Sequence, residues 1–402
     1  MKNISFLFLL ISTIVLGQNI KSIQLFNPQT NDETPVIKFG EQLILSFDDL
    51  QNSSTVYKYT IKHYNRNWEE DGLFYTEYAN GSMNANILDY KYSFNTTQKY
   101  THYTLAFPNE KILPKISGNF ELIVYKDSPS KSLFKKKFCV VEMGASLAIN
   151  ISRFSDNKRP NVNQRAEVIA TSNQSDLLTN LSSTSLTVIQ NNNFNTGILG
   201  QKVQSVMGNK LLFQQMDLVF PGNNEFYYFD NKIMNQPFDT VAAVENNEEG
   251  NHTYLHPVWA YPLNYQYQPD VNGAFYFRRN DLGIERNAET EADYSWVYFS
   301  LYSDKMEKEL YVLGAFNEYV PSKESQMFYD GNTKRYVAKI YLKQGFYNYI
   351  LATKDQKDNL DLGEINGSFW QTENLYQAFL YYTSFGKNYD GLLGYGELRR
   401  NR

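Results

Sequence analysis

The chain has 402 residues, with 43 Asn, 32 Tyr, 27 Phe and a single Cys. Its net charge of −5 argues against a nucleic-acid partner, which needs a basic surface. One cysteine excludes a disulfide framework and a cluster of thiolate metal ligands. An aromatic content of 16% excludes a disordered chain. Abundant Tyr, Phe, Thr, Val and Ile with Asn-rich turns favour strands over helices.

The N-terminus has the pattern of a secretory signal peptide over residues 1–17. A short positive segment, Met1–Asn3, precedes an apolar run, Ile4–Val15, and we expect cleavage after Gly17. The run is too short to span the roughly 30 Å core of a bilayer as a helix. A buried first strand is the alternative interpretation. We expect an exported protein. There is no Cys at the cleavage point, so we expect no lipid anchor.

The first block after this segment, residues 18–144, alternates strand patterns with turn signals. Apolar and polar side chains alternate over several short stretches, which is typical of strands with one buried face. They include Gln42–Phe47, Tyr57–Tyr64, Tyr100–Phe107, Phe120–Tyr125 and Lys135–Val141. This spacing predicts a β-sandwich of immunoglobulin or fibronectin-III type, with a turn at Asp48-Asp49.

Two further blocks continue the strand patterns. Residues 145–288 are expected to form a central β-rich domain, in which the acidic stretch Val241–Thr253 is interpreted as a mobile loop. Residues 289–402 are expected to form a C-terminal β-sandwich, with a last clear strand at Gln377–Thr383. The predicted fold class is therefore all-β, with tandem immunoglobulin or fibronectin-III-like sandwich domains in series.

The sequence offers little material for a metal site. His252 and His256 are the only close histidine pair, with Glu249 upstream. On a helix they would share one face and could hold zinc, but Pro257 follows and the inner Glu of a metalloprotease motif is missing. Ordinary surface or packing histidines are the better interpretation, and we expect no metal and no other cofactor.

Catalytic patterns are also missing. Asp48 and Asp49 are adjacent, so in a strand they would point to opposite faces and could not act as the paired carboxylates of a glycosidase. Neither a Gly-x-Ser-x-Gly elbow nor a phosphate-binding glycine loop occurs. Cys139 lies in an apolar strand pattern and is interpreted as a small buried hydrophobe. The sequence therefore predicts a protein that is not an enzyme.

Several short stretches follow one another along almost the whole mature chain, and none is a catalytic signature. They include Leu43–Leu50, Tyr57–Tyr64, Phe107–Asn109, Lys115–Phe120, Glu291–Tyr294, Leu342–Tyr349, Thr372–Tyr376 and Tyr389–Tyr395. In their order and number they resemble the type IX secretion system plug protein family of Bacteroidota. One departure is Tyr64, where we expect Cys in many relatives, so that Cys139 has no candidate partner.

The resemblance implies a periplasmic protein, peripheral to the inner face of the outer membrane. It implies one partner, the β-barrel translocon of the type IX secretion system, whose periplasmic opening the protein would seal. It implies neither membrane insertion, nor nucleic acid, nor a small-molecule substrate. Candidate contact residues are those of two polar loops: Asn191, Asn192, Asn193, Phe194 and Asn195 in one, and Glu245, Asn246, Asn247, Glu248 and Glu249 in the other.

The competing interpretation is a periplasmic carbohydrate-binding module, because aromatic sandwiches often stack sugars. That function needs two or three coplanar exposed aromatic rings on one sheet face. Tyr298, Tyr311, Tyr341 and Tyr349 are the candidates, although aromatic residues in strands more often belong to the core.

Overall fold

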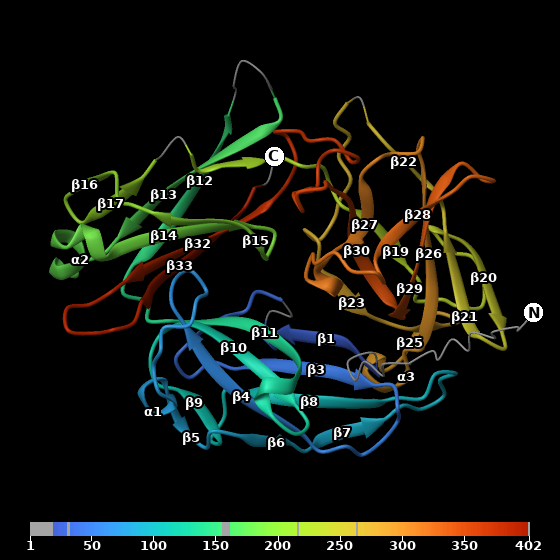
Figure 1. The fold of residues 1–402 in the computed structure, drawn as a ribbon, viewed down its shortest axis with the longest axis horizontal. Coiled ribbons are helices and arrows are strands. Elements are labelled where there is room, and N and C mark those ends of the chain that lie inside the picture. The colour runs from blue at the N-terminus through green and yellow to red at the C-terminus, as the bar shows by residue number, and fades with distance from the viewer. Residues whose placement is uncertain (1–18, 30–32, 155–160, 215–216, 263, 401–402) are drawn as a thin grey trace, which may run out of the picture.

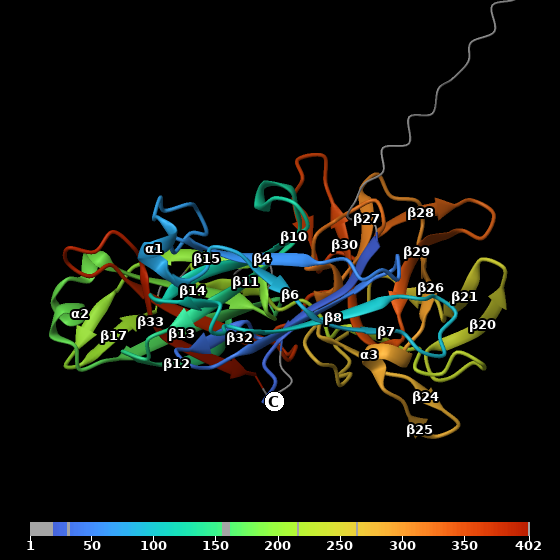
Figure 2. The same ribbon diagram turned by 90° about the horizontal axis from the view of Figure 1, so that it is seen from below.

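A computed structural model describes residues 19–29, 33–154, 161–214, 217–262 and 264–400. The expected signal peptide lies outside these residues. The strands form three groups that meet around a common junction (Figure 1). The N-terminal domain lies in front of the other two in the view from below and spans the line where they meet (Figure 2). None of the helices in the described ranges is long and apolar enough to cross a membrane.

The N-terminal domain is a sandwich of two sheets. One sheet has the order β1 (Ile20–Phe26), β3 (Leu43–Asp49), β8 (Thr101–Phe107), β7 (Asp89–Tyr92). The other has the order β2 (Val36–Lys38), β11 (Ser132–Val141), β10 (Gly118–Tyr125), β4 (Tyr57–Tyr64), β6 (Ala85–Ile87). A small pair, β5 (Ala79–Gly81) and β9 (Ile112–Pro114), and the short helix α1 (Tyr75–Tyr78) complete it.

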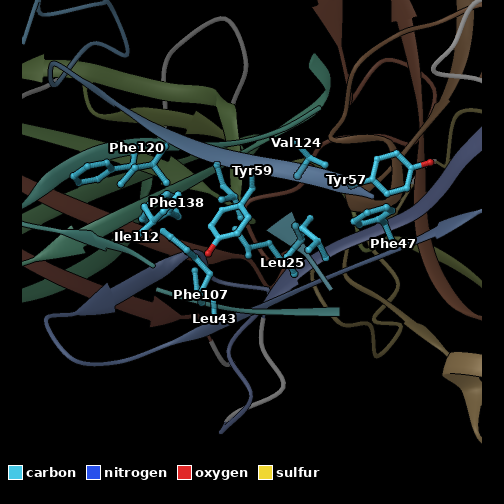
Figure 3. Close-up of a cluster of buried hydrophobic side chains, with 14 of the residues drawn as sticks. Leu25, Leu43, Phe47, Tyr57, Tyr59, Phe107, Ile112, Phe120, Val124 and Phe138 are labelled. Carbon is cyan, nitrogen blue, oxygen red and sulfur yellow. The ribbon is translucent and has the colours of Figure 1, made fainter. Parts of the chain in front are cut away.

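Period-two alternation produces the core of this domain. Leu43, Leu45 and Phe47 of β3 are fully buried and point into the space between the sheets. Phe47 stacks on Tyr103 of β8 at 5.0 Å and meets Tyr57 of β4 edge-on at 5.4 Å. Figure 3 shows these aromatic and aliphatic side chains converging from both sheets. Each buried side chain of this size contributes about 1.5–3 kcal/mol, so the aromatic residues supply much of the stability.

The second domain is also a two-sheet sandwich, and its strands come from both ends of the remaining chain. One sheet contains β12 (Ser146–Phe154), β13 (Asn163–Thr171), β17 (Lys210–Phe213) and β16 (Ser205–Met207), with β18 (Val219–Pro221) paired to β13. The other has the order β15 (Asn193–Gln201), β14 (Thr184–Gln190), β32 (Leu375–Tyr382), β33 (Gly391–Arg399). A short helix, α2 (Ser175–Thr179), precedes β14.

The pairing of β32 with β14 corrects the predicted division at residues 145–288 and 289–402. Leu186 of β14 lies opposite Leu380 of β32, so the last two strands belong to the second domain. Figure 1 shows these red strands among the green ones. Local patterns identify a strand but not its partner. Both strands are buried on both faces, so nothing in the sequence indicates which sheet receives them.

The third domain is inserted between β18 and β32. Its strands form one continuous sheet that folds over at β28: β19 (Tyr227–Asp230), β30 (Gly345–Lys354), β27 (Glu309–Leu313), β28 (Gln326–Asp330), β29 (Arg335–Lys343), β26 (Tyr294–Tyr302), β21 (Gly250–Leu255), β20 (Val241–Asn247). Short strands β22 (Val258–Trp259), β23 (Phe275–Phe277) and β31 (Leu360–Asp361) pair at its sides. A hairpin of β24 (Asn280–Asp281) and β25 (Ile284–Glu285) leads to α3 (Ala288–Glu291).

The fold as a whole is all-β, as the sequence predicts, and its helices are single turns. The predicted loop at Val241–Thr253 is instead the hairpin β20–β21. Strand β21 runs parallel to β26 and bonds to it from Asn251 to Tyr254, which holds the acidic hairpin in the sheet. Acidic and Asn-rich composition indicated a loop, and tertiary pairing overrode that preference.

We predict that Leu380→Ala weakens the second domain rather than the third. Leu380 is fully buried opposite Leu186, so the cavity is expected to cost about 2–5 kcal/mol. Hydrogen exchange should rise in β13 and β14 while β26 and β29 keep their protection. Phe385→Ala, at a fully exposed position between β32 and β33, is the matched control and should change little. Faster exchange confined to β26 and β29 would contradict the pairing.

Candidate functional site

Two hollows meet where the three domains join. The larger, about 980 Å³, lies between the second and third domains. The smaller, about 260 Å³, also reaches Lys136 and Lys137 of the N-terminal domain. Both are lined by Asn193 and Asn195 of β15 and by Tyr319 and Val320 of the third domain, so they are two ends of one depression. We call it the junction groove.

The predicted contact segment Asn191–Asn195 lies at this groove and is largely internal. Asn191 and Asn192 both have positive φ angles, 56° and 55°, and form the tight turn between β14 and β15. Asn tolerates this left-handed conformation better than other non-glycine residues. The Asn191 side chain is buried, donates to Asn374 Oδ1 at 2.8 Å and accepts from the backbone N–H of Leu375 at 2.8 Å. These contacts make it a structural residue.

The next residues connect the domains. Phe194 meets Trp68 of the N-terminal domain edge-on at 5.1 Å, with the Lys137 ammonium 4.6 Å from the centre of the Trp68 ring. Burial lowers the pKa of Lys137 below its usual value. Asn195 is exposed and donates to the backbone oxygen of Glu318 in the third domain at 3.4 Å. Of the five predicted residues, Asn192, Asn193, Phe194 and Asn195 therefore line the groove.

A network of neutral amides lies behind the groove. Gln190 donates to the Pro221 oxygen at 3.0 Å and accepts from Asn223 Nδ2 at 3.1 Å. Gln164 accepts from Asn374 at 3.1 Å and from the Tyr376 hydroxyl at 2.5 Å. Asn223 is 95% buried and lines the groove, and its Oδ1 has no hydrogen-bond partner among the described residues. An unpaired buried acceptor is costly, about 1–3 kcal/mol.

The second predicted segment, Glu245–Glu249, lies elsewhere. It forms the end of the β20–β21 hairpin, at the side of the third domain remote from the second domain (Figure 1). All five side chains are exposed. Glu245 accepts from the Tyr254 hydroxyl at 3.0 Å, and Glu249 lies 3.8 Å from Lys339. The two predicted segments therefore do not form one surface.

A buried ion pair joins the N-terminal domain to the third domain. Asp48 of β3 and Lys343 of β29 are both fully buried, with Oδ2 and Nζ 2.7 Å apart. The Tyr294 hydroxyl donates to the same oxygen at 2.7 Å, and His102 Nδ1 lies 2.6 Å from Oδ1. The Lys343 ammonium also lies 4.3 Å from the centre of the Tyr100 ring. We call this set the interdomain ion pair.

The surroundings of Asp48 favour its charged form. Burial alone would raise the pKa of Asp48, but Lys343 and His102 together outweigh burial and hold it below its usual value. The pKa of Lys343 lies below its usual value, because the lowering by burial exceeds the raising by the Asp48 carboxylate. We assign both groups as ionised, because the carboxylate receives three close partners and the ammonium faces a carboxylate, a backbone oxygen and an aromatic ring.

Asp48 and Asp49 correct the turn that the sequence predicted there. Both lie within β3 and are fully buried, and they point to opposite faces as adjacent strand residues must. Asp49 turns into its own domain, where it accepts from the Ser53 and Tyr57 hydroxyls, each at 3.0 Å. Two adjacent acids are a strong turn signal, and only the partners supplied from elsewhere in the chain make their burial possible.

The residues considered for a metal site are engaged in packing. His252 is buried in β21, with Nδ1 3.0 Å from the Tyr298 hydroxyl and Nε2 3.1 Å from Asn247 Oδ1. His256 follows the end of that strand and is exposed. In the part of the chain that the structure describes, no three His, Cys, Asp or Glu side chains converge on a metal-sized site.

Cys139 is fully buried between the N-terminal and second domains, as predicted for a small hydrophobe. Its Sγ lies 3.4 Å from Asn119 Oδ1, and the Tyr381 hydroxyl donates to the same oxygen at 2.8 Å. Burial raises the pKa of the thiol, so it stays protonated and unreactive at neutral pH.

Comparison with known proteins finds a family match for the N-terminal domain. Residues 20–142 match the family model described as the type 9 secretion system plug protein first domain. The N-terminal domain is therefore similar to the first domain of this family. The match spans both sheets of the N-terminal sandwich, and it supports a role in type IX secretion and a periplasmic, secretion-associated location. No curated protein matches the chain.

The remaining two domains also occur together in a solved structure. A crystal structure of a hypothetical protein from Parabacteroides merdae is 27% identical to this chain, with a TM-score of 0.88, and the alignment covers 95% of this chain and 98% of that one. The arrangement of three sandwiches is therefore shared with another protein. Dimeric latent PorU from Porphyromonas gingivalis is 11% identical over 95% of this chain and 34% of its own, with a TM-score of 0.16.

We predict that Lys343→Met destabilises the joint between the plug first domain and the third domain. The substitution leaves the Asp48 carboxylate buried without its counter-ion, which is expected to cost about 3–5 kcal/mol in urea unfolding. Lys308→Met is the control, because its partly exposed pair with Glu364 is screened by solvent and should contribute little. The double variant Asp48→Asn/Lys343→Met should recover most of the loss. If Lys343→Met and Lys308→Met lowered the free energy of unfolding equally, the buried pair would contribute no more to stability than the partly exposed pair.

The same pair predicts a pH dependence. The pKa of Asp48 is lower in the folded protein than its usual value of 3.8, so its contribution is fully present above about pH 5 and is lost as the pH falls through the folded pKa. The difference in the free energy of unfolding between the wild type and Asp48→Asn should therefore be largest near neutral pH and should become small in acid. Urea titrations at several pH values measure it. A difference that stays constant down to pH 2 would mean that folding does not lower the pKa of Asp48, and a wild type that gains stability over Asp48→Asn in acid would mean that Asp48 is neutral in the folded protein.

Proposed function

We propose that this protein is a non-enzymatic plug that seals the periplasmic opening of the outer-membrane type IX secretion translocon. The observation that carries the proposal is the plug first domain over residues 20–142, fixed to two further sandwiches by buried contacts. A channel for folded cargo is wide, and an object that closes it has to keep its shape. The expected partner is the translocon barrel, and the expected location is the periplasm, against the inner face of the outer membrane.

Stiffness of the three-domain body supports this role. Alternate residues of β32 face different domains: Ala378 and Leu380 enter the core of the second domain, whereas Phe379 and Tyr381 pack against Cys139 and its neighbours in the first. The interdomain ion pair fixes the first domain to the third. Interfaces of this kind resist the relative domain motion that is otherwise expected in multidomain chains.

The geometry does not favour the carbohydrate-binding alternative. Tyr311 and Tyr349 are buried in the third domain. Tyr298 and Tyr341 are partly buried, and their rings face neighbouring rings: Tyr298 stacks on Tyr254 at 4.4 Å and 16°, and Tyr341 on Tyr294 at 5.3 Å and 26°. The Tyr341 hydroxyl also donates to Gln98 of the N-terminal domain at 3.1 Å. Such rings stand beside one another and do not form a flat platform for a sugar.

We predict that deletion of the gene makes the outer membrane leak, and that the leak passes through the translocon. Uptake of a large fluorescent dye or antibiotic that intact outer membranes exclude should rise in the deletion strain and return to normal on complementation. It should also return to normal when the translocon barrel is deleted as well. A leak that persists without the barrel, or the absence of any leak, would rule out the proposed seal.

Physical association supplies an independent measurement. Tagged protein purified from detergent-solubilised outer membranes should bring down a large β-barrel protein in a defined ratio. A tagged periplasmic protein of unrelated function is the control for trapping. The proposal predicts a complex that survives moderate salt, because the mature chain has a nearly balanced charge and contacts would be mainly polar and aromatic.

A further inference from the structure

The chain passes between the second and third domains twice, and the two passages are bonded to each other. Residues 222–226 lead from β18 to β19, and residues 362–374 lead back to β32. The backbone oxygen of Asn223 accepts from the Phe369 N–H and from the Thr372 hydroxyl, each at 2.8 Å. These bonds make the two passages one joint between the domains.

Three carboxyl groups lie close enough at this joint to repel one another when they are ionised. Glu225 belongs to the outgoing passage, Glu373 to the returning one, and Asp270 to the loop before β23 of the third domain. Glu225 Oε1 accepts from the Glu373 backbone N–H at 3.2 Å and from the Tyr265 hydroxyl. Asp270 Oδ2 accepts from the Phe226 backbone N–H at 2.6 Å. We call Glu225, Asp270 and Glu373 the acidic joint.

The acidic joint is buried without a counter-ion. Only 6% of Glu225 is exposed, and within the described ranges no Lys, Arg or His forms an ion pair with any of its three carboxyl groups. Burial raises the pKa of Glu225 to about 7 and that of Asp270 to about 6, and neighbouring carboxylates add to both shifts. The hydrogen bonds favour the ionised forms but do not outweigh burial. Glu225 therefore changes its charge close to neutral pH.

The other charged and titratable groups around the acidic joint do not neutralise it. Arg399, at the end of β33, opposes the rise in the pKa of Asp270 only in part, and Arg400 bonds to backbone oxygens of the returning passage. The Tyr319 hydroxyl interacts with Asp270, and burial raises the pKa of Tyr319, so this hydroxyl stays protonated. Ionisation of Glu225 therefore adds an uncompensated negative charge inside the joint.

We propose that the acidic joint is a proton-dependent switch that sets how firmly the third domain is held on the second. With Glu225 neutral, the two passages stay bonded. With Glu225 ionised, repulsion from Asp270 and Glu373 and the cost of a buried charge weaken the joint. The interdomain ion pair responds in the opposite direction, because it is lost in acid. Acid thus weakens the contact of the third domain with the first and strengthens its contact with the second.

Native-state hydrogen exchange of the full-length protein between pH 5 and 8 tests the switch. The readout is the opening constant of peptides 222–230 and 366–375, corrected for the intrinsic exchange rate at each pH. The pKa of Glu225 is higher in the folded protein than its usual 4.5, so its contribution to stability is fully present below about pH 4.5 and is lost as the pH rises through about 7. Relative to Glu225→Gln, the opening constant of the wild type should rise by up to about tenfold per pH unit between pH 5 and 7 and then level off.

Two further variants separate the switch from a merely structural role. Glu397→Gln removes an exposed carboxylate that also accepts a tyrosine hydroxyl, from Tyr395 at 2.7 Å, and should follow the wild type. Tyr265→Phe removes a donor that favours the ionised form of Glu225, so the rise should end at a higher pH. Infrared difference spectra between pH 5 and 8 should show the loss of a buried carboxylic acid band that Glu225→Gln removes.

The proposal is overturned if the ratio of the opening constants of the wild type and Glu225→Gln stays constant between pH 5 and 8, or falls as the pH rises. A constant ratio different from one would mean that Glu225 only supports the structure. The proposal is also overturned if Glu397→Gln behaves like Glu225→Gln, or if the pH-dependent opening is confined to peptides outside the joint. This switch goes beyond the proposed seal and is measured on the chain by itself, so it and the seal can fail separately.

Discussion

The arrangement of the three sandwiches depends on the interdomain ion pair of Asp48 and Lys343. Removing two charges from water is costly, and the cost is recovered only where each charge meets its partners at close range. Tyr294 and His102 complete the shell of Asp48, and these four side chains come from two domains. A different orientation of the domains would leave two buried charges unpaired. The pair therefore contributes more to the choice of a single orientation than to stability in itself.

The second interface works by apolar packing. Strands β14 and β32 are buried on both faces, because one face meets the other sheet of the second domain and the other face meets the first domain. The face of β32 toward the first domain carries Phe379 and Tyr381, which a solvent-exposed strand face would replace with polar residues, whereas the same face of β14 combines Ile189 with Ser185 and Thr187. Two different mechanisms, ionic on one side and apolar on the other, thus hold the plug first domain against its neighbours. The groove lies where the three domains meet.

The sequence predicted what depends on local pattern. The strands at Leu43–Phe47 and Tyr57–Tyr64, the buried Cys139 and the all-β class follow from alternation and composition. It did not predict what depends on distant partners. In its local sequence Asp48 resembles a turn residue, because its counter-ion, Lys343, lies almost three hundred positions later in the chain. The Asn191–Asn195 run had the composition of a loop, yet its amides bond to residues near the C-terminus. No local signal marked the unpaired oxygen of Asn223 as part of a groove.

The insertion of the third domain between β18 and β32 has a consequence for the order of folding. Thr184 pairs with Tyr382, so the central strand pair of the second sandwich joins positions separated by nearly half of the chain. During synthesis or export from the N-terminus, β14 has no partner on that side until the entire third domain has emerged. Pairing across such a separation is slow unless the intervening residues are already compact. The third domain therefore acts as a folded spacer whose own completion brings the last two strands to the sheet that they close.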